Sequence, residues 1–141
     1  MANFTLEIQN DHSDEVIREM ERKAAQALEA IGIQCSSHAK QIITAASRVD
    51  TGTMRNTINH VVRTDEGAVY VGTNTRYAIY HEYGTGIYAD GGGGRKTPWR
   101  YVDSKGVGHW THGIRPIHFL KKAVQDHASE YKQIIEKFLK A

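Results

Sequence analysis

The stretch GGGGRKT, at residues 91–97, has the composition of a phosphate-binding loop. Glycine-rich loops followed by Lys and Ser or Thr wrap phosphate groups with their backbone N–H groups. The Walker A pattern, however, requires glycine at the positions that Asp90 and Arg95 hold. It also requires a helix directly after the loop, whereas Pro98 and Trp99 begin a segment with strand character. The stretch therefore predicts a mobile glycine loop with a basic rim, and not a nucleotide site.

Eight histidines make a metal site the next chemistry to consider. The densest group comprises His109, His112 and His118. On a strand, His109 and His112 would point to opposite faces, and sites of this spacing usually also recruit cysteines or a second pair on a helix. His81-Glu82 begins like a zincin motif, but Thr85 stands where the second histidine is required. We therefore expect no metal and no cofactor.

Other catalytic patterns are equally weak. There is no G-x-S-x-G motif to place a nucleophilic serine. The single cysteine, Cys35, lies on an apolar helical stripe, which favours a buried small side chain over a nucleophile. Carboxylates are present at several positions, but no pattern pairs them. The sequence predicts that this protein is not an enzyme.

Aromatic side chains are concentrated in residues 77–110, around the glycine loop. Such residues are enriched at protein interfaces and on surfaces that stack nucleic-acid bases, and core packing of short strands accounts for a part of them. The members of this group are Tyr77, Tyr80, Tyr83, Tyr88, Trp99, Tyr101 and Trp110. We take Tyr80, Tyr83, Trp99 and Trp110 as interface candidates.

The composition predicts one domain over residues 1–141. The chain is 40% hydrophobic, and its 18 Lys and Arg against 16 Asp and Glu give a net charge of +2. That balance gives no electrostatic indication of nucleic-acid binding. The N-terminus has no signal-peptide pattern and no apolar run is long enough to span a bilayer, so we expect a soluble protein made in the cytoplasm, with no membrane partner.

The elements that must position these residues follow from periodicity. Residues 4–8 alternate like a strand, and residues 13–47 repeat apolar side chains every three or four positions, as in one long helix, with a bend expected at Gly32. Ser13 or Asp14 is expected to cap this helix. The predicted buried stripe is Val16, Met20, Ala24, Ala27, Ile31, Cys35, Ala39, Ile42 and Ala46.

Two hairpins and two further helices complete the prediction. The pattern predicts one β-hairpin over residues 58–72 and another over residues 98–103 and 107–111. Residues 77–83 form a short helix, and Pro116 begins a C-terminal helix that runs to about residue 138. We expect an α+β fold in which an antiparallel sheet, built from both hairpins and the N-terminal strand, packs against the long N-terminal helix and the C-terminal helix.

Four segments together carry a family resemblance. Residues 49–58, VDTGTMRNTI, resemble the V-D-T-G-x-L-R-x-S-I signature of the head–tail joining, or tail-completion, proteins of long-tailed double-stranded DNA phages and prophages. VGTN before Tyr77-Ala78, YHEYGTG at 80–86, and Arg115-Pro116 with FL at 119–120 and Ala123 follow in the family's order. The resemblance spans residues 49–123, with Met54 for the usual leucine and Ile117-His118 where a second proline falls.

The resemblance implies a structural virion protein of the neck, between the portal end of the capsid and the top of the tail. Its implied partners are other neck, connector or tail-tube proteins and further copies of itself, in a ring matched to the sixfold tail. It would assemble in the host cytoplasm and then reside at the head–tail junction. The glycine loop, residues 84–97, would order on docking or border the DNA channel, where Arg95 and Lys96 could contact passing DNA.

The resemblance gives a set of motif residues with architectural roles. Asp50 is expected to cap the turn over residues 51–57, a contribution of about 1 kcal/mol. Arg55 and Glu82 are expected to pair, either within one subunit or between subunits. Gly84 and Gly86 are expected to allow a sharp exit into the loop, and Phe119 with Leu120 to anchor the last helix on the sheet. The full set is Asp50, Thr51, Gly52, Arg55, Tyr77, Glu82, Tyr83, Gly84, Gly86, Pro116, Phe119 and Leu120.

Two alternatives stay open at this point. One is a nucleic-acid-binding module that uses the tyrosine cluster and the Arg95-Lys96 loop, which a steep salt dependence of DNA affinity would support. The other is a metal-dependent hydrolase that uses His81, His109 and His112, which bound zinc in the purified protein would support.

Overall fold

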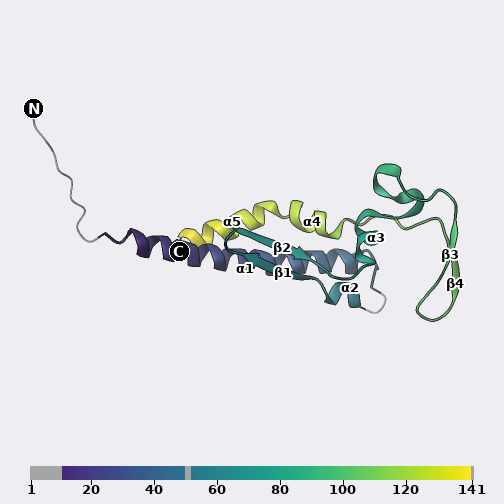
Figure 1. Ribbon diagram of the computed structural model, residues 1–141, viewed down its shortest axis with the longest axis horizontal. Helices are drawn as coiled ribbons and strands as arrows, with labels where there is room; N and C mark the ends of the chain where they lie inside the picture. The colour runs from purple at the N-terminus through teal and green to yellow at the C-terminus, as the bar shows by residue number, and fades with distance from the viewer. Residues whose placement is uncertain (1–10, 50–51, 141) are drawn as a thin grey trace, which may run out of the picture.

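A single long helix organises the molecule. The computed structural model describes residues 11–49 and 52–140. Helix α1 (Ser13–Ala45) has 33 residues, which corresponds to a length of about 50 Å. The hairpin of β1 (Asn59–Arg63) and β2 (Ala68–Gly72) and the helices α4 (Phe119–Gln125) and α5 (Ala128–Lys140) lie along it (Figure 1). The short helices α2 (Thr53–Asn56) and α3 (Ala78–Tyr83) lie near its C-terminal end. The predicted α+β class is confirmed.

The N-terminal end of α1 differs from the prediction. His12 is the N-cap residue, and the carboxylate that accepts a first-turn amide is Asp11, whose Oδ1 lies 2.9 Å from the Ser13 nitrogen. Neither Ser13 nor Asp14 therefore caps the helix. Figure 1 shows the first turns of α1 extending past the end of α5, and Val16 and Met20 of the predicted stripe are 54% and 55% exposed.

The middle of α1 carries the core as predicted. Ala27, Ile31, Cys35 and Ala39 are buried, whereas near the end of the helix the fully buried residue is Ile43 rather than Ile42. The side chains that pack around this stripe come from α2, α3, α4, α5 and the residue before β1. They are Met54, Ile58, Ala78, Phe119, Ala123 and Tyr131.

Gly32 does not interrupt α1. The helix is continuous through this position, and the glycine faces His60 of β1. A Cβ atom placed there would lie 2.6 Å from His60 Cγ, so glycine leaves the room against the helix that the His60 ring occupies. Next to it, His60 Nε2 lies 2.7 Å from Glu29 Oε1 and joins the hairpin to α1.

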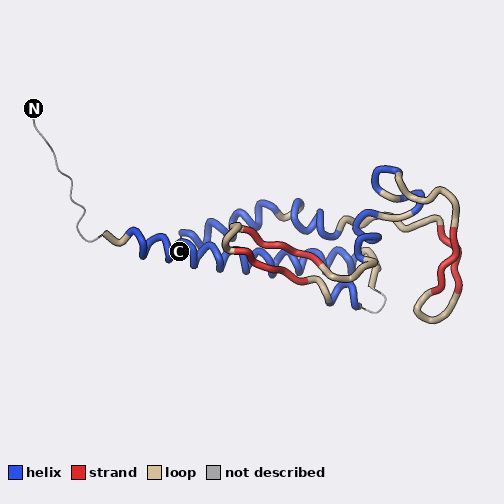
Figure 2. Tube along the Cα trace, viewed as in Figure 1, coloured by secondary structure: helices blue, strands red, loops and turns tan. Residues whose placement is uncertain are grey.

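Both predicted hairpins are present, but they do not share a sheet. In the described residues β1 pairs with β2, and β3 (Trp99–Val102) pairs with β4 (Gly108–Thr111), in two separate two-stranded sheets. Figure 2 shows the second hairpin standing across the end of the molecule, away from the first. We call β3–β4 and its turn the arm. The expected strand at residues 4–8 lies outside the described residues.

The C-terminal helix is two helices. Pro116 is not in the first turn, because α4 begins at Phe119, after His118 in the left-handed conformation (φ 50°). The helix is then interrupted at residues 126–127. The Ala123 carbonyl, which a continuous helix would bond to residue 127, instead accepts the buried hydroxyl of Tyr131. Tyr131 thus satisfies the backbone at the interruption and fastens α5 to α4.

Candidate interaction site at the arm end

A large hollow lies between the end of α1, α3 and the arm. It has a volume of about 1070 Å³. Family-motif residues and aromatic residues line it together, among them Met54, Arg55, Tyr77, Tyr80, His81, Trp99 and Tyr101. Segments separated by about fifty positions in the sequence therefore meet at one surface.

Arg48 holds the wall of this hollow in place. Its Nη2 donates to the Arg115 carbonyl at 2.9 Å, and its Nη1 lies 3.0 Å from His81 Nδ1. Because a guanidinium only donates, His81 Nδ1 is the acceptor and carries no proton. Burial lowers the pKa of His81, and the Arg48 charge lowers it further. The site therefore contains a histidine that the fold keeps neutral.

The four interface candidates fall in different places. Tyr80, which is 54% exposed, and Trp99 line the large hollow. Tyr83 lines a second hollow of about 560 Å³ beside α4, and it is 55% exposed. Trp110 lies on the arm with 72% of its surface exposed, outside both hollows. The structure thus brings two of the four together and leaves the arm with an exposed indole.

Glu82 has a role that the sequence did not reveal. Its carboxylate is buried and accepts two backbone amides of α4, from Leu120 at 2.9 Å and from Lys121 at 3.0 Å. A carboxylate at this position satisfies free N–H groups and interacts favourably with the helix dipole. Arg55 Nη1 instead donates to Thr44 Oγ1 at 3.3 Å. Within one subunit, the described residues therefore show no Arg55–Glu82 pair, and a pair between subunits stays a prediction.

Gly84 and Gly86 lie where two segments run side by side. The Thr85 nitrogen donates to the Ile114 carbonyl and the Ile87 nitrogen to the His112 carbonyl, both at 3.0 Å. Gly86 has φ 62°, and a Cβ atom there would overlap the His112 carbonyl oxygen. The segment that contains Pro116 is thus used for this pairing, and the helix starts later.

The glycine loop folds back on itself. Lys96 Nζ donates to the Gly92 carbonyl at 2.8 Å, and the Arg95 guanidinium lies 5.6 Å from the centre of the Trp99 ring. Residues 90–92 form one short 3₁₀ turn, and the loop leads into β3. It therefore lacks the following helix that a phosphate-binding loop requires, as the sequence predicts.

At the family signature, Asp50 and Thr51 lie outside the described residues. Gly52 follows with φ 83° and precedes the first residue of α2. The α2 turn ends with the Thr57 hydroxyl, which donates to the Met54 carbonyl at 3.0 Å. The capping role expected of Asp50 stays a prediction.

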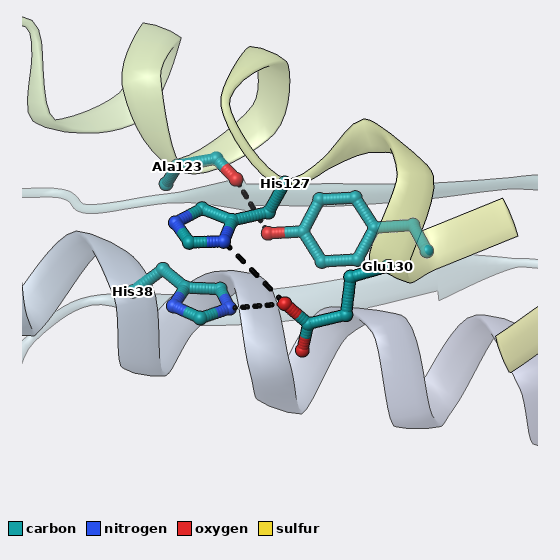
Figure 3. Close-up of polar contacts among 5 residues, drawn as sticks. His38, Ala123, His127 and Glu130 are labelled. Carbon is teal, nitrogen blue, oxygen red and sulfur yellow. Dashed lines mark hydrogen bonds and ion pairs between the residues drawn. The ribbon is translucent and has the colours of Figure 1, made fainter. Parts of the chain in front are cut away.

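The histidines of the hydrolase alternative are held in separate places. His81 lies against Arg48, and His109 Nε2 lies 2.7 Å from Asp103 Oδ2 in the arm turn. His112 follows β4, and its carbonyl accepts the Ile87 amide. His118, the third histidine of the densest group in the sequence, has its Nε2 3.2 Å from Asp90 Oδ2. Among the described residues, the group of three side chains with metal-ligand atoms close together is a different one, His38, His127 and Glu130 (Figure 3). Its only sequence signal is the H-x-x-E spacing of residues 127–130, and the partner on α1 depends on helix register.

Comparison with known proteins gives one family. The model of a family described as "Bacteriophage HK97-gp10, putative tail-component" matches residues 4–84, more than half of the chain. Curated proteins and solved structures give no match. Among the described residues, no helix combines the length and the apolar character needed to cross a membrane. The matched range contains two of the four segments that carry the resemblance noted from the sequence, and it ends inside the third, at residue 84. The chain therefore belongs to the HK97 gp10-like family of phage tail components.

Proposed function

We propose that the protein is a head–tail connector, or tail-completion, component that forms a ring at the head–tail junction. Family membership supports a structural protein that resides in the virion and contacts other virion proteins. In this proposal, the subunits make a ring that matches the sixfold tail, after assembly in the host cytoplasm. A ring of identical subunits needs a head-to-tail interface, in which two different surfaces of each subunit meet.

The observation that carries the proposal is the arm beside the aromatic hollow. The arm exposes Trp110 and Val102, which are 72% and 62% accessible. Exposed apolar side chains gathered on one projecting hairpin are characteristic of a surface that another protein covers. The hollow of about 1070 Å³ at the base of the arm offers a second, differently shaped surface. One subunit thus presents both halves of a heterologous contact.

The test is electron microscopy of an induced lysate in which the gene carries an early stop codon. DNA-filled heads beside finished but unattached tails would support the joining role. Normal infectious particles would contradict it. Heads without tails of any kind would place the protein in tail assembly and contradict a role confined to joining.

The glycine loop is proposed to border the DNA path. Arg95 and Lys96 are exposed, and their contacts within the loop hold both cationic groups near the base of the arm. Substituting both by serine removes two positive charges without changing the core. We expect particles that assemble but eject DNA more slowly; unchanged assembly together with unchanged ejection would remove this part of the proposal.

A further inference from the structure

Three side chains of the types that commonly bind metals meet where α5 packs on α1. His38 comes from α1, and His127 precedes the first residue of α5, one helical turn before Glu130. Glu130 Oε2 lies 3.0 Å from His38 Nε2 and 3.4 Å from His127 Nδ1. The two imidazole rings are stacked, with centroids 3.5 Å apart and planes within 4° (Figure 3). The potential ligand atoms all lie within 4.8 Å of one another.

The two nitrogen–oxygen separations lie close to those around a bound transition metal. In a tetrahedral zinc site with bonds of about 2.0–2.2 Å, neighbouring ligand atoms lie about 3.3–3.6 Å apart. The two nitrogen–oxygen distances, 3.0 and 3.4 Å, fall close to this range. Two imidazoles and one carboxylate are also a donor set that Zn²⁺ accepts.

The burial and the charge of these three side chains also fit a divalent transition-metal ion. The His38 side chain is 15% exposed, whereas those of His127 and Glu130 are 33% and 40% exposed, so the group opens to solvent on one side. Solvent can then supply a fourth ligand. With neutral rings, the three groups carry one negative charge, which favours a divalent cation. The Tyr131 hydroxyl is engaged by the Ala123 carbonyl and is not part of the ligand set.

We propose that His38, His127 and Glu130 bind one divalent transition-metal ion, with zinc as the best fit. The ion links α5 to α1 and so fixes the C-terminal helix on the body. Stacked parallel rings direct their nitrogen lone pairs side by side, so binding turns the ring planes apart until both lone pairs point at the ion. Protons compete for the same nitrogens, and the affinity therefore falls as the pH is lowered.

The experiment is isothermal titration of tag-free full-length protein with Zn²⁺, together with Co²⁺ absorption and a thermal melt. We expect one ion per chain, the visible spectrum of tetrahedral Co²⁺, and a rise in Tm of roughly 5–10 °C at ion concentrations about a hundred times the Kd. His38→Ala, His127→Ala and Glu130→Gln are each expected to weaken binding at least about tenfold. Glu130→Gln keeps the side-chain shape, and circular dichroism checks that each variant folds.

His109→Ala is the matched control, because His109 also faces a carboxylate but lies on the arm. This variant is expected to bind Zn²⁺ like the parent protein. Absence of saturable Zn²⁺ binding would overturn the proposal. Binding that survives the double substitution of His38 and His127 would also overturn it, since the ion would then be held elsewhere. The outcome does not depend on the ring at the head–tail junction.

Discussion

At the scale of single residues, Glu82 decides how α3 and α4 meet. Its buried carboxylate accepts the Leu120 and Lys121 amides, so truncation removes the partner of two part-buried backbone donors. We expect Glu82→Ala to lower the free energy of unfolding by about 2–3 kcal/mol, since both hydrogen bonds are charge-assisted. Urea denaturation measures this loss.

Glu136→Ala provides the control, because Glu136 is an exposed glutamate on α5. We expect this change to alter stability by less than about 0.5 kcal/mol. Equal effects of the two substitutions would show that the Glu82 carboxylate contributes nothing at α4.

The second prediction at this scale concerns His81. Burial and the neighbouring Arg48 lower its pKa in the folded chain, whereas the unfolded chain takes up this proton near pH 6.5, so the unfolded state binds more protons in acid. Stability is therefore expected to fall as the pH drops from 7 toward 5. His81→Gln should flatten this part of the profile, measured by denaturant melts at several pH values. His112→Gln, at an exposed histidine, should leave it unchanged.

At the scale of elements, the contact between α1 and the first hairpin depends on Gly32. Alanine has the higher helix propensity by about 1 kcal/mol, but its Cβ would displace the His60 ring and disturb the contact with Glu29. We expect Gly32→Ala to destabilise the protein by about 1–3 kcal/mol. Gly93→Ala, in open space with negative φ, should be neutral or slightly stabilising. A more stable Gly32→Ala protein, by thermal melt, would contradict this account.

The sequence predicts elements better than it predicts their partners. The helix over residues 13–47, the short helix at 77–83 and both hairpins follow from periodicity, because side-chain spacing reports local backbone geometry. Periodicity carries no information about which strands pair, and the single predicted sheet is wrong for this reason. Pro116 suggested a helix start, but its segment pairs with the Thr85 backbone instead.

At the candidate site too, the sequence predicts some of the residues but not their contacts. Tyr80 and Trp99 could be selected as aromatic residues near a motif, and the structure places both at one hollow. The roles of Arg48 and Glu82 could not be selected, because each depends on a contact 33 or more positions away in the sequence. The same applies to His38 and Glu130, whose contact spans 92 positions.

At the scale of the whole molecule, the core lies along α1 and the exposed aromatic surface lies at the arm end (Figure 1). This separation predicts that changes in the arm affect assembly without unfolding the subunit. Trp110→Ser should leave the Tm within about 2 °C, because exposed side chains contribute little to stability. It should reduce the yield of infectious particles at least about tenfold, as interface aromatics often contribute 2 kcal/mol or more.

Tyr70→Ser is the comparison, since Tyr70 is 57% exposed on β2 and donates a hydrogen bond to the nearby Glu66. Plaque counts after complementation of the stop-codon phage measure both variants. A full yield of infectious particles with Trp110→Ser would argue against the arm as an interface.

The arm also carries an intrinsic fluorescence signal that can follow assembly. Both tryptophans of the chain, Trp99 and Trp110, lie on the arm, and none lies along α1. When indole is excited selectively, the fluorescence of the protein therefore comes from the arm alone. Free subunits should emit at the long wavelengths of a hydrated indole, and a partner that covers Trp110 should shift the emission toward the blue. Fluorescence can thus follow docking in real time without an added dye, while the core stays spectroscopically silent.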